Sequence, residues 1–160
     1  MNRVALFPGS FDPFTKGHED IVLRGLRLFD QVVIGIGNNA TKKRYFALEV
    51  MKEMIEKTFS GEKNVKVITY DDLTAHTARE LGATFLLRGL RNTTDFEYEN
   101  GISQVNRYLY EEIETVFLIT SPNFAPISSS IIRDLHRYGQ RVDDFLPYSL
   151  SELDKLSQES

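Results

Sequence analysis

The sequence contains no cysteine among its 160 residues. Without cysteine the chain forms neither a disulfide framework nor a thiolate metal site, as is usual in a reducing compartment. Long hydrophobic runs are missing too. The apolar run after Met1-Asn2-Arg3 is cut by Pro8-Gly9, so it is too short for a signal peptide, and no segment reaches membrane-spanning length. We therefore expect a cytoplasmic protein with no membrane partner.

A surplus of positive charge is also missing, because 23 acidic residues outnumber 19 basic ones and give a formal net charge of −4. A protein that grips a nucleic-acid backbone needs a broad basic surface, so we expect no nucleic-acid partner. Small phosphorylated ligands need only a local basic cluster. The triplet Lys42-Lys43-Arg44 and the pair Arg88 and Arg91 are such clusters, although a basic triplet is more often simply a solvated surface.

The chain does have the composition of a globular domain, with 41% apolar and 26% charged residues. A chain of this length suffices for one α/β domain but is too short for two ordinary ones. The sequence shows no linker, internal repeat or low-complexity segment. We therefore expect a single domain over residues 1–160.

Strand and helix patterns alternate along the chain. Apolar and β-branched runs predict five strands, at Val4 to Phe7, Gln31 to Gly37, Val65 to Tyr70, Thr84 to Leu87 and Val116 to Ile119. Helical spacing of apolar residues predicts helices marked by Ile21 to Phe29, Ala47 to Phe59, Leu73 to Leu81, Tyr98 to Leu109, Ile131 to Leu135 and Leu150 to Leu156. Such crossovers produce a parallel sheet covered on both faces. We predict an α/β, Rossmann-like, doubly wound five-stranded sheet of order 3-2-1-4-5 with a C-terminal helix.

The segment from Phe7 to His18 joins the first strand to the first helix and reads Phe-Pro-Gly-Ser-Phe-Asp-Pro-Phe-Thr-Lys-Gly-His. Such a turn lies at the carboxyl edge of the sheet, where a helix N-terminus offers unpaired N–H groups and partial positive charge to an anion. Its glycines allow close backbone approach, and Ser10, Thr15 and His18 add polar groups. We predict a phosphate site here. The alternative is that Thr15 or Asp12 caps the helix and His18 is only a first-turn residue.

A second glycine motif, Gly35-x-Gly37, ends the predicted second strand. It is only a fragment of the dinucleotide-binding fingerprint, which needs three glycines after the first strand and an acidic residue near the end of the second. Asn38-Asn39 stands where that acidic residue would be. We therefore expect no nicotinamide cofactor.

Arg88 and Arg91 flank Gly89 directly after the predicted fourth strand. This spacing aims two guanidinium groups and a backbone amide at phosphate oxygens, which the planar arginine fork binds in pairs. Because the first and fourth strands are neighbours in the predicted order, both turns would face one crevice. The alternative is that the arginines form salt bridges with Asp95, Glu97 or Glu99.

Three serines, Ser128-Ser129-Ser130, precede the helix marked by Ile131 to Leu135. One serine suffices for an N-cap, whereas three add hydroxyl and amide donors suited to a triphosphate. The remaining histidines, His76 and His136, belong to no cluster with metal-ligand spacing. We expect both to be ordinary surface or partly buried residues and expect no protein-held metal.

No nucleophile, base and orienting group stand out from spacing alone. Phosphate chemistry does not require them, because a phosphate monoester is an adequate nucleophile and pyrophosphate an adequate leaving group. An enzyme that joins the two must hold the anions in line and stabilise the charge that grows on the reacting phosphate.

Together these segments resemble the nucleotidylyltransferase superfamily. Gly9-Ser10-Phe11-Asp12-Pro13 and Thr15-Lys16-Gly17-His18 resemble its signature in the T-x-G-H variant of bacterial phosphopantetheine adenylyltransferases. The blocks at Lys42, at Arg88-Gly89-Leu90-Arg91 and at Ile127-Ser128-Ser129-Ser130 follow in that family's order and spacing, so the resemblance covers essentially the whole chain. It departs at Ser10, where threonine is common, and at Lys16, where asparagine is frequent.

The resemblance implies reversible transfer of an adenylyl group from ATP to 4′-phosphopantetheine, forming 3′-dephospho-coenzyme A and pyrophosphate in coenzyme A biosynthesis. It further implies Mg²⁺ bound with ATP and a homohexamer, for which the dense apolar residues Tyr108, Leu109 and Tyr110 are the support in the sequence. Two alternatives are a sister enzyme acting on another phosphorylated acceptor, such as nicotinamide mononucleotide, and a non-catalytic nucleotide-binding module.

The resemblance also assigns roles to individual residues. It implies catalytic roles for Ser10, His18, Lys42 and Arg91, and acceptor contacts from Ser10, Lys42, Thr74 and Arg88. It implies ATP contacts from Ser10, Phe11, His18, Gly89, Leu90, Arg91, Glu99, Phe124, Ala125, Pro126, Ile127, Ser128, Ser129 and Ser130.

Overall fold

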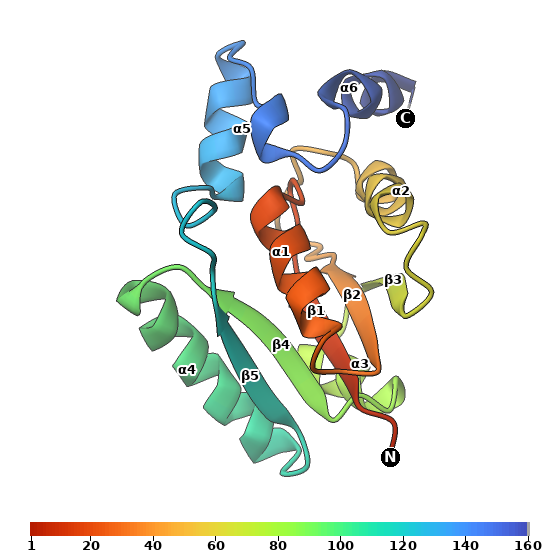
Figure 1. Cartoon of the computed structure of the whole chain (residues 1–160), viewed down its shortest axis with the longest axis vertical. Helices are drawn as coiled ribbons and strands as arrows, with labels where there is room; N and C mark the ends of the chain where they lie inside the picture. Colours follow the sequence, from red (N-terminus) through yellow and green to blue (C-terminus); the bar gives the residue numbers. More distant parts are fainter. Residues whose placement is uncertain (160) are drawn as a thin grey trace.

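A computed structural model describes residues 1–159 of the chain. Its core is one sheet of five parallel strands in the order β3-β2-β1-β4-β5, which confirms the predicted order (Figure 1). The strands are β1 (Val4–Gly9), β2 (Gln31–Gly37), β3 (Val65–Tyr70), β4 (Phe85–Leu90) and β5 (Glu114–Ile119). The strand order reverses direction between β1 and β4, and this topological switch point is where an open α/β sheet has its ligand-binding crevice.

The described residues form six α-helices, of which the first five each follow a strand, as the alternating pattern predicted. They are α1 (Lys16–Gly25), α2 (Leu48–Thr58), α3 (Thr74–Glu80), α4 (Thr93–Leu109), α5 (Ser129–Arg137) and α6 (Leu150–Glu159), with a 3₁₀ turn η1 (Asp143–Phe145) before the last. None of the helices in the described residues is long and apolar enough to span a membrane.

The two faces of the sheet bury two separate clusters, because successive strand residues point to opposite sides. From β1, Ala5 and Phe7 enter the cluster that α1, α2 and α6 cover. Leu6 points the other way and packs with Ala75 and Ala78 of α3. Strands buried on both sides in this manner explain why their sequences are almost continuously apolar.

Two predicted boundaries were wrong by several residues. Helix α1 ends at Gly25, not near Phe29, although Phe29 remains buried and its ring lies 5.2 Å from that of Phe85. A Cβ atom on Gly25 would come within 2.6 Å of the Leu87 side chain, so any other residue at this helix end would force Leu87 of β4 to shift. Strand β4 in turn runs on to Leu90, which places Arg88 inside the strand.

Helix α4 exists where the apolar spacing predicted it, but that spacing marks an exposed face. Tyr98, Ile102, Val105 and Leu109 are 70%, 38%, 58% and 41% exposed. Glu99 is the one buried residue of the helix. A helix whose apolar stripe faces outward is the pattern of a surface that another subunit or a ligand covers.

The helix-end signals read from the sequence were correct in most cases. Gly82 adopts φ +67° directly after α3, as a C-capping glycine does. Ser128 caps α5 by accepting the Ile131 N–H, and Ser149 accepts the Glu152 N–H before α6. The Glu152 carboxylate binds Lys57 of α2 and so ties α6 to the rest of the molecule.

Candidate active site

Two adjoining cavities open at the carboxyl ends of the strands, where the topology places the crevice. The smaller, about 320 Å³, lies among the β1–α1 turn, β4 and the N-terminus of α5. The larger, about 710 Å³, lies among β1, the β2–α2 loop, α3 and α4. Six residues line both cavities and so form their junction: Pro8, Gly9, Ser10, Lys42, Arg88 and Glu99.

The residues predicted to act on ligands divide between these cavities. All four residues assigned to catalysis line the smaller cavity: Ser10, His18, Lys42 and Arg91. So do Phe11, Gly89, Glu99, Phe124, Ile127, Ser128, Ser129 and Ser130 from the predicted ATP set. The predicted acceptor residues Ser10, Lys42, Thr74 and Arg88 all line the larger cavity. Among the described residues 1–159, the predicted ATP contacts Leu90, Ala125 and Pro126 line neither of the two.

His18 closes a hydrogen-bonded box at the start of α1. The Thr15 hydroxyl accepts the His18 N–H, and the Thr15 N–H donates to Nδ1 of His18 at 3.0 Å. A backbone N–H is always a donor, so Nδ1 must be the unprotonated nitrogen of the ring. The helix-start alternative is therefore correct for Thr15, but it leaves His18 with a protonated Nε2 on the other edge of its ring.

Apolar rings surround His18 while it lines the smaller cavity. The rings of Phe11 and Phe14 lie 5.0 Å and 5.3 Å from the imidazole, and that of Phe7 lies 6.2 Å away. Burial, followed by the positive charges of Arg88 and Arg91, lowers the pKa of His18 to about 3. At neutral pH the side chain is thus a neutral N–H donor held in one tautomer.

Arg88 forms an ion pair with Glu99, so the salt-bridge alternative is correct for this residue. Its Nε donates to Glu99 at 2.8 Å, a second N–H binds the other carboxylate oxygen, and a third binds the Pro8 carbonyl. A guanidinium group has five N–H donors, so two remain for a ligand. The pair fixes the arginine fork at the junction of both cavities.

Arg91 is held in a similar way by Asp95, the third residue of α4. The guanidinium binds both carboxylate oxygens at 3.0 Å and 3.2 Å, and the Arg91 N–H binds one of them at 3.0 Å. Burial alone would raise the pKa of Asp95, but hydrogen bonds from Arg91 lower it below its usual range. Arg91 is therefore a charged group beside the smaller cavity that an incoming anion would compete for.

The three serines before and within α5 have three different partners. Ser128 is the N-cap, Ser129 donates to the Pro13 carbonyl at 2.8 Å, and Ser130 accepts from Arg133 at 3.2 Å. The block therefore joins α5 to the β1–α1 turn. It also leaves the first amide groups of α5 at the cavity, where a helix N-terminus attracts phosphate.

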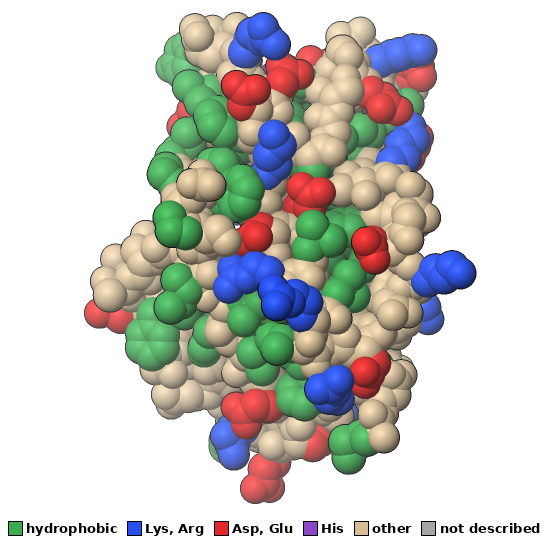
Figure 2. Space-filling model, viewed as in Figure 1, with side chains coloured by type: hydrophobic (Ala, Val, Ile, Leu, Met, Phe, Trp, Pro, Cys, Tyr) green, Lys and Arg blue, Asp and Glu red, His purple; other side chains and the backbone are tan. Residues whose placement is uncertain are grey.

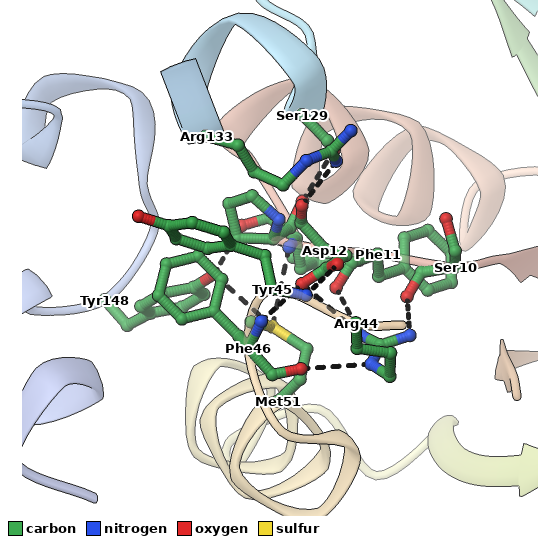
Figure 3. Close-up of polar contacts among 12 residues, drawn as sticks. Ser10, Phe11, Asp12, Arg44, Tyr45, Phe46, Met51, Ser129, Arg133 and Tyr148 are labelled. Carbon is green, nitrogen blue, oxygen red and sulfur yellow. Dashed lines mark hydrogen bonds and ion pairs between the residues drawn. The ribbon is translucent and has the colours of Figure 1, made fainter. Parts of the chain in front are cut away.

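The side chains of Arg44, Asp12 and Arg133 hold the β1–α1 turn in place (Figure 3), and the alternative in which Asp12 caps α1 is wrong, because Thr15 is the N-cap. Arg44 donates to the carbonyls of Ser10 at 2.6 Å and Phe11 at 3.2 Å. The Asp12 carboxylate accepts the N–H groups of residues 45 and 46 at 2.7 Å and 2.8 Å, and its carbonyl accepts from Arg133 at 2.7 Å. The only sequence signal for Arg44 was its place in the basic triplet, and Arg133 had none.

No group of three or more His, Cys, Asp or Glu residues among residues 1–159 could hold a metal ion. His76 lies 3.3 Å from Asp72 at the exposed start of α3. His136 lies between the Tyr45 hydroxyl at 2.7 Å and Asp154 at 3.1 Å, and so joins α5 to α6. Both are partly buried, within the prediction of surface or partly buried residues.

Comparison with known proteins agrees with this arrangement. Residues 6–135 match the cytidylyltransferase-like family model. The fold is similar to that of a bifunctional NMN adenylyltransferase/ADP ribose pyrophosphatase from Francisella tularensis, with a TM-score of 0.70 and 19% identity over 92% of this chain and 46% of that one. This chain thus spans about half the length of that structure, and at such identity the likeness shows the fold alone.

Curated relatives are much closer in sequence. The phosphopantetheine adenylyltransferase of Cytophaga hutchinsonii is 61% identical over 94% of this chain and 100% of its own length. The enzyme of Flavobacterium johnsoniae is 54% identical over 91% of this chain and 95% of its own length. The enzyme of Streptococcus agalactiae is 47% identical over 99% of this chain and 100% of its own length. Together with a phosphate-type turn, a fixed arginine fork and a serine-capped helix around one crevice, this likeness shows that the chain belongs to the phosphopantetheine adenylyltransferase family.

Proposed function

We infer that this protein is an adenylyltransferase that moves an adenylyl group from ATP to 4′-phosphopantetheine and releases pyrophosphate, a step of coenzyme A biosynthesis. The observation that carries the inference is the pair of cavities that meet at Ser10, Lys42 and Arg88. ATP would occupy the smaller cavity, with its phosphates toward the N-termini of α1 and α5. The acceptor would occupy the larger cavity, with its phosphate at the junction.

In the reaction a phosphate oxygen of the acceptor forms a bond to the α-phosphorus of ATP. The bond from that phosphorus to the bridging oxygen breaks, and its electron pair leaves with pyrophosphate. Lys42 and the free N–H groups of Arg88 would hold the acceptor phosphate, while Nε2–H of His18 and the Ser10 hydroxyl would donate to the α-phosphate. Donors fixed before the reaction stabilise the growing charge without reorganisation, so the mechanism needs no enzyme base.

The remaining donors fit the departing pyrophosphate. Arg91 would exchange Asp95 for the β- and γ-phosphates, and the first amides of α5 would contribute their partial positive charge. Adenylyl transfer from ATP uses a divalent metal ion. Of the two carboxylates of the smaller cavity, Glu99 stays paired with Arg88, so Asp95 is the one that this exchange would release. We propose that the phosphates of ATP would hold the Mg²⁺, which would supply partial neutralisation of their charge.

We further propose that the protein assembles as a homohexamer. The support is the outward apolar stripe of α4 with the 76% exposed Ile119 of β5, and Figure 2 shows hydrophobic side chains gathered on that side of the molecule. Burying such a patch against a copy of itself is the usual way that a small domain removes it from water. Sedimentation equilibrium tests this, and a monomer would contradict it. The cytoplasmic location stays a prediction.

The test of function is pyrophosphate release from ATP with separate acceptors. We expect turnover with 4′-phosphopantetheine and much slower turnover with nicotinamide mononucleotide. Preference for the nucleotide would favour the sister enzyme, and tight ATP binding without any pyrophosphate exchange would favour a non-catalytic module.

A further inference from the structure

The peptide bond between Phe14 and Thr15 carries hydrogen bonds on both sides. Its carbonyl accepts from the Tyr148 hydroxyl at 2.6 Å, and its N–H donates to Nδ1 of His18 at 3.0 Å. A trans peptide points its C=O and N–H in opposite directions within one plane, so Tyr148 and His18 lie at opposite edges of the same amide group. Figure 3 shows Tyr148 reaching the turn from the segment that precedes α6.

We propose that Tyr148 is a positioning residue for adenylyl transfer, which fixes the tautomer and orientation of His18 through the peptide bond that both of them contact. The proposal rests on the catalytic role that we propose for His18. Tyr148 itself touches neither cavity.

The physical basis is cooperativity along a hydrogen-bonded chain. Donation to a carbonyl polarises the amide and strengthens its N–H as a donor. A stronger N–H at Nδ1 stabilises the ring form whose proton is on Nε2, the edge left for a ligand. Burial raises the pKa of Tyr148 well above its usual range, so the phenol keeps its proton and remains a donor.

The neighbouring carbonyls show why this contact differs from ordinary loop anchoring. The five successive carbonyls from Ser10 to Phe14 all accept from side chains, in turn Arg44 twice, Arg133, Ser129 and Tyr148. The peptide of the Asp12 carbonyl has no N–H, because its nitrogen belongs to Pro13. The peptide of the Pro13 carbonyl has the N–H of Phe14, which donates to the sulfur of Met51 at 3.5 Å. Of these five peptides, only that bound by Tyr148 continues to the side chain of a predicted catalytic residue.

The main test is Tyr148→Phe, with Tyr45→Phe as the matched control. Tyr45 also reaches the C-terminal helices through its hydroxyl, which contacts His136 at 2.7 Å, but that hydroxyl does not touch the turn. Each variant loses one oxygen atom and keeps its ring. We expect Tyr148→Phe to lower kcat about three- to tenfold with KM nearly unchanged, as for the loss of one hydrogen bond that acts in the transition state. Equal kcat values in the two variants would overturn the proposal.

The same substitution in a His18→Ala background shows whether the effect passes through His18. We expect no further loss there, because the two side chains act in series. An undiminished loss from Tyr148→Phe in that background would overturn the proposal. If His18→Ala alone keeps the rate of the parent, the proposed role of His18 fails, and the coupling is then decided by spectroscopy.

Nitrogen NMR of the imidazole of His18 provides that readout in the free protein. Removing the Tyr148 donor should raise the pKa of His18 and decrease the share of the tautomer protonated on Nε2, whereas Tyr45→Phe should change neither. An unchanged His18 spectrum in Tyr148→Phe would overturn the proposal whatever the rate does. If the phenylalanine variant does not fold, site-specific 3-fluorotyrosine in place of Tyr148, which is a stronger donor, must shift the His18 pKa downward.

Discussion

The β1–α1 turn and the β2–α2 loop both reach the junction of the two cavities, but they are built differently. In the turn, residues 11–15 are all buried, and four side chains from three other parts of the chain bind its carbonyls. In the loop, residues 38–43 are all exposed, and Lys42 stands on a surface segment. Fixed donors suit the reacting phosphate, where reorganisation would cost rate, whereas an exposed lysine can follow the acceptor as it enters. Arg44 joins the two regions.

The largest expected effect is on kcat, from removing the key side chain of the turn, His18. Removing the imidazole by His18→Ala should lower kcat on the order of 100-fold and leave both KM values nearly unchanged, because the donor acts mainly as charge develops. Steady-state kinetics on protein with a normal melting curve measures this. Turnover within a few-fold of the parent would mean that His18 only starts the helix.

Arg44→Ala tests how far the turn depends on its clamp. Its guanidinium binds two carbonyls of the turn and lies 3.9 Å from the buried Asp12 carboxylate. Removal leaves the two carbonyls without their donor and leaves the Asp12 charge balanced only by the N–H groups of residues 45 and 46, so we expect a loss of about 2–4 kcal/mol in the free energy of unfolding. Lys43→Ala is the control, because this neighbouring side chain is exposed and should change stability by less than about 0.5 kcal/mol. Urea unfolding compares the two, and equal midpoints would contradict a clamp.

Lys42→Ala should behave differently from His18→Ala. If Lys42 binds the acceptor phosphate in the ground state as well as later, kcat should fall and the acceptor KM rise, with kcat/KM lowered about tenfold or more. Because the loop is exposed, the melting temperature should stay that of the parent. A fall in kcat with no change in the acceptor KM would show that Lys42 acts mainly in the transition state, as we expect for the fixed donors of the turn.

The pH dependence of stability reports the neutral state of His18. The folded protein lowers the pKa of His18 from 6.5 to about 3, so between these values the unfolded chain binds the proton first. Stability from this group is therefore full above pH 6.5 and falls as the pH is lowered, by at most about 1.4 kcal/mol per pH unit. We expect the free energy of unfolding to fall less between pH 7 and pH 5 in His18→Gln than in the parent. Parallel curves would contradict a neutral His18.

The smallest effect should be on the KM for ATP, from weakening the ion pair between Asp95 and Arg91, because we expect Arg91 to leave Asp95 for the phosphates of ATP. Asp95→Asn weakens the hold on Arg91, so the KM for ATP should fall about two- to fivefold, within the range of a partly exposed ion pair. Glu97→Gln removes a nearby exposed charge and serves as control. An ATP KM that rises in Asp95→Asn would show that Asp95 positions Arg91 and does not compete for it.

Local sequence patterns predicted most of the fold. Alternating apolar runs located all five strands, and capping residues such as Ser128 marked helix starts, because these signals lie within a few residues of one another. The α4 stripe was recognised as helical, but spacing alone does not say whether a face meets the core or the outside. Boundaries such as the end of β4 depend on pairing with distant strands.

The candidate site was predictable only for side chains that stand in short motifs. His18, Arg88 and Ser129 belong to such motifs, and all three line the smaller cavity. Arg133 and Tyr148 lie 121 and 134 residues from the carbonyls that they bind. Their acceptors are backbone groups, which every residue has, so no pairing of side-chain types pointed to them.

The most direct test of the account compares His18→Gln with His18→Ala. Glutamine is an ordinary third residue of a helix capping box, so its carbonyl can replace Nδ1 at the Thr15 N–H while its amide offers a neutral donor near the position of Nε2. If His18 works as a fixed neutral donor, glutamine should restore at least about tenfold of the rate lost in the alanine variant. If His18 instead transfers a proton, glutamine will be as slow as alanine, and the account of a base-free, charge-stabilising site will be wrong.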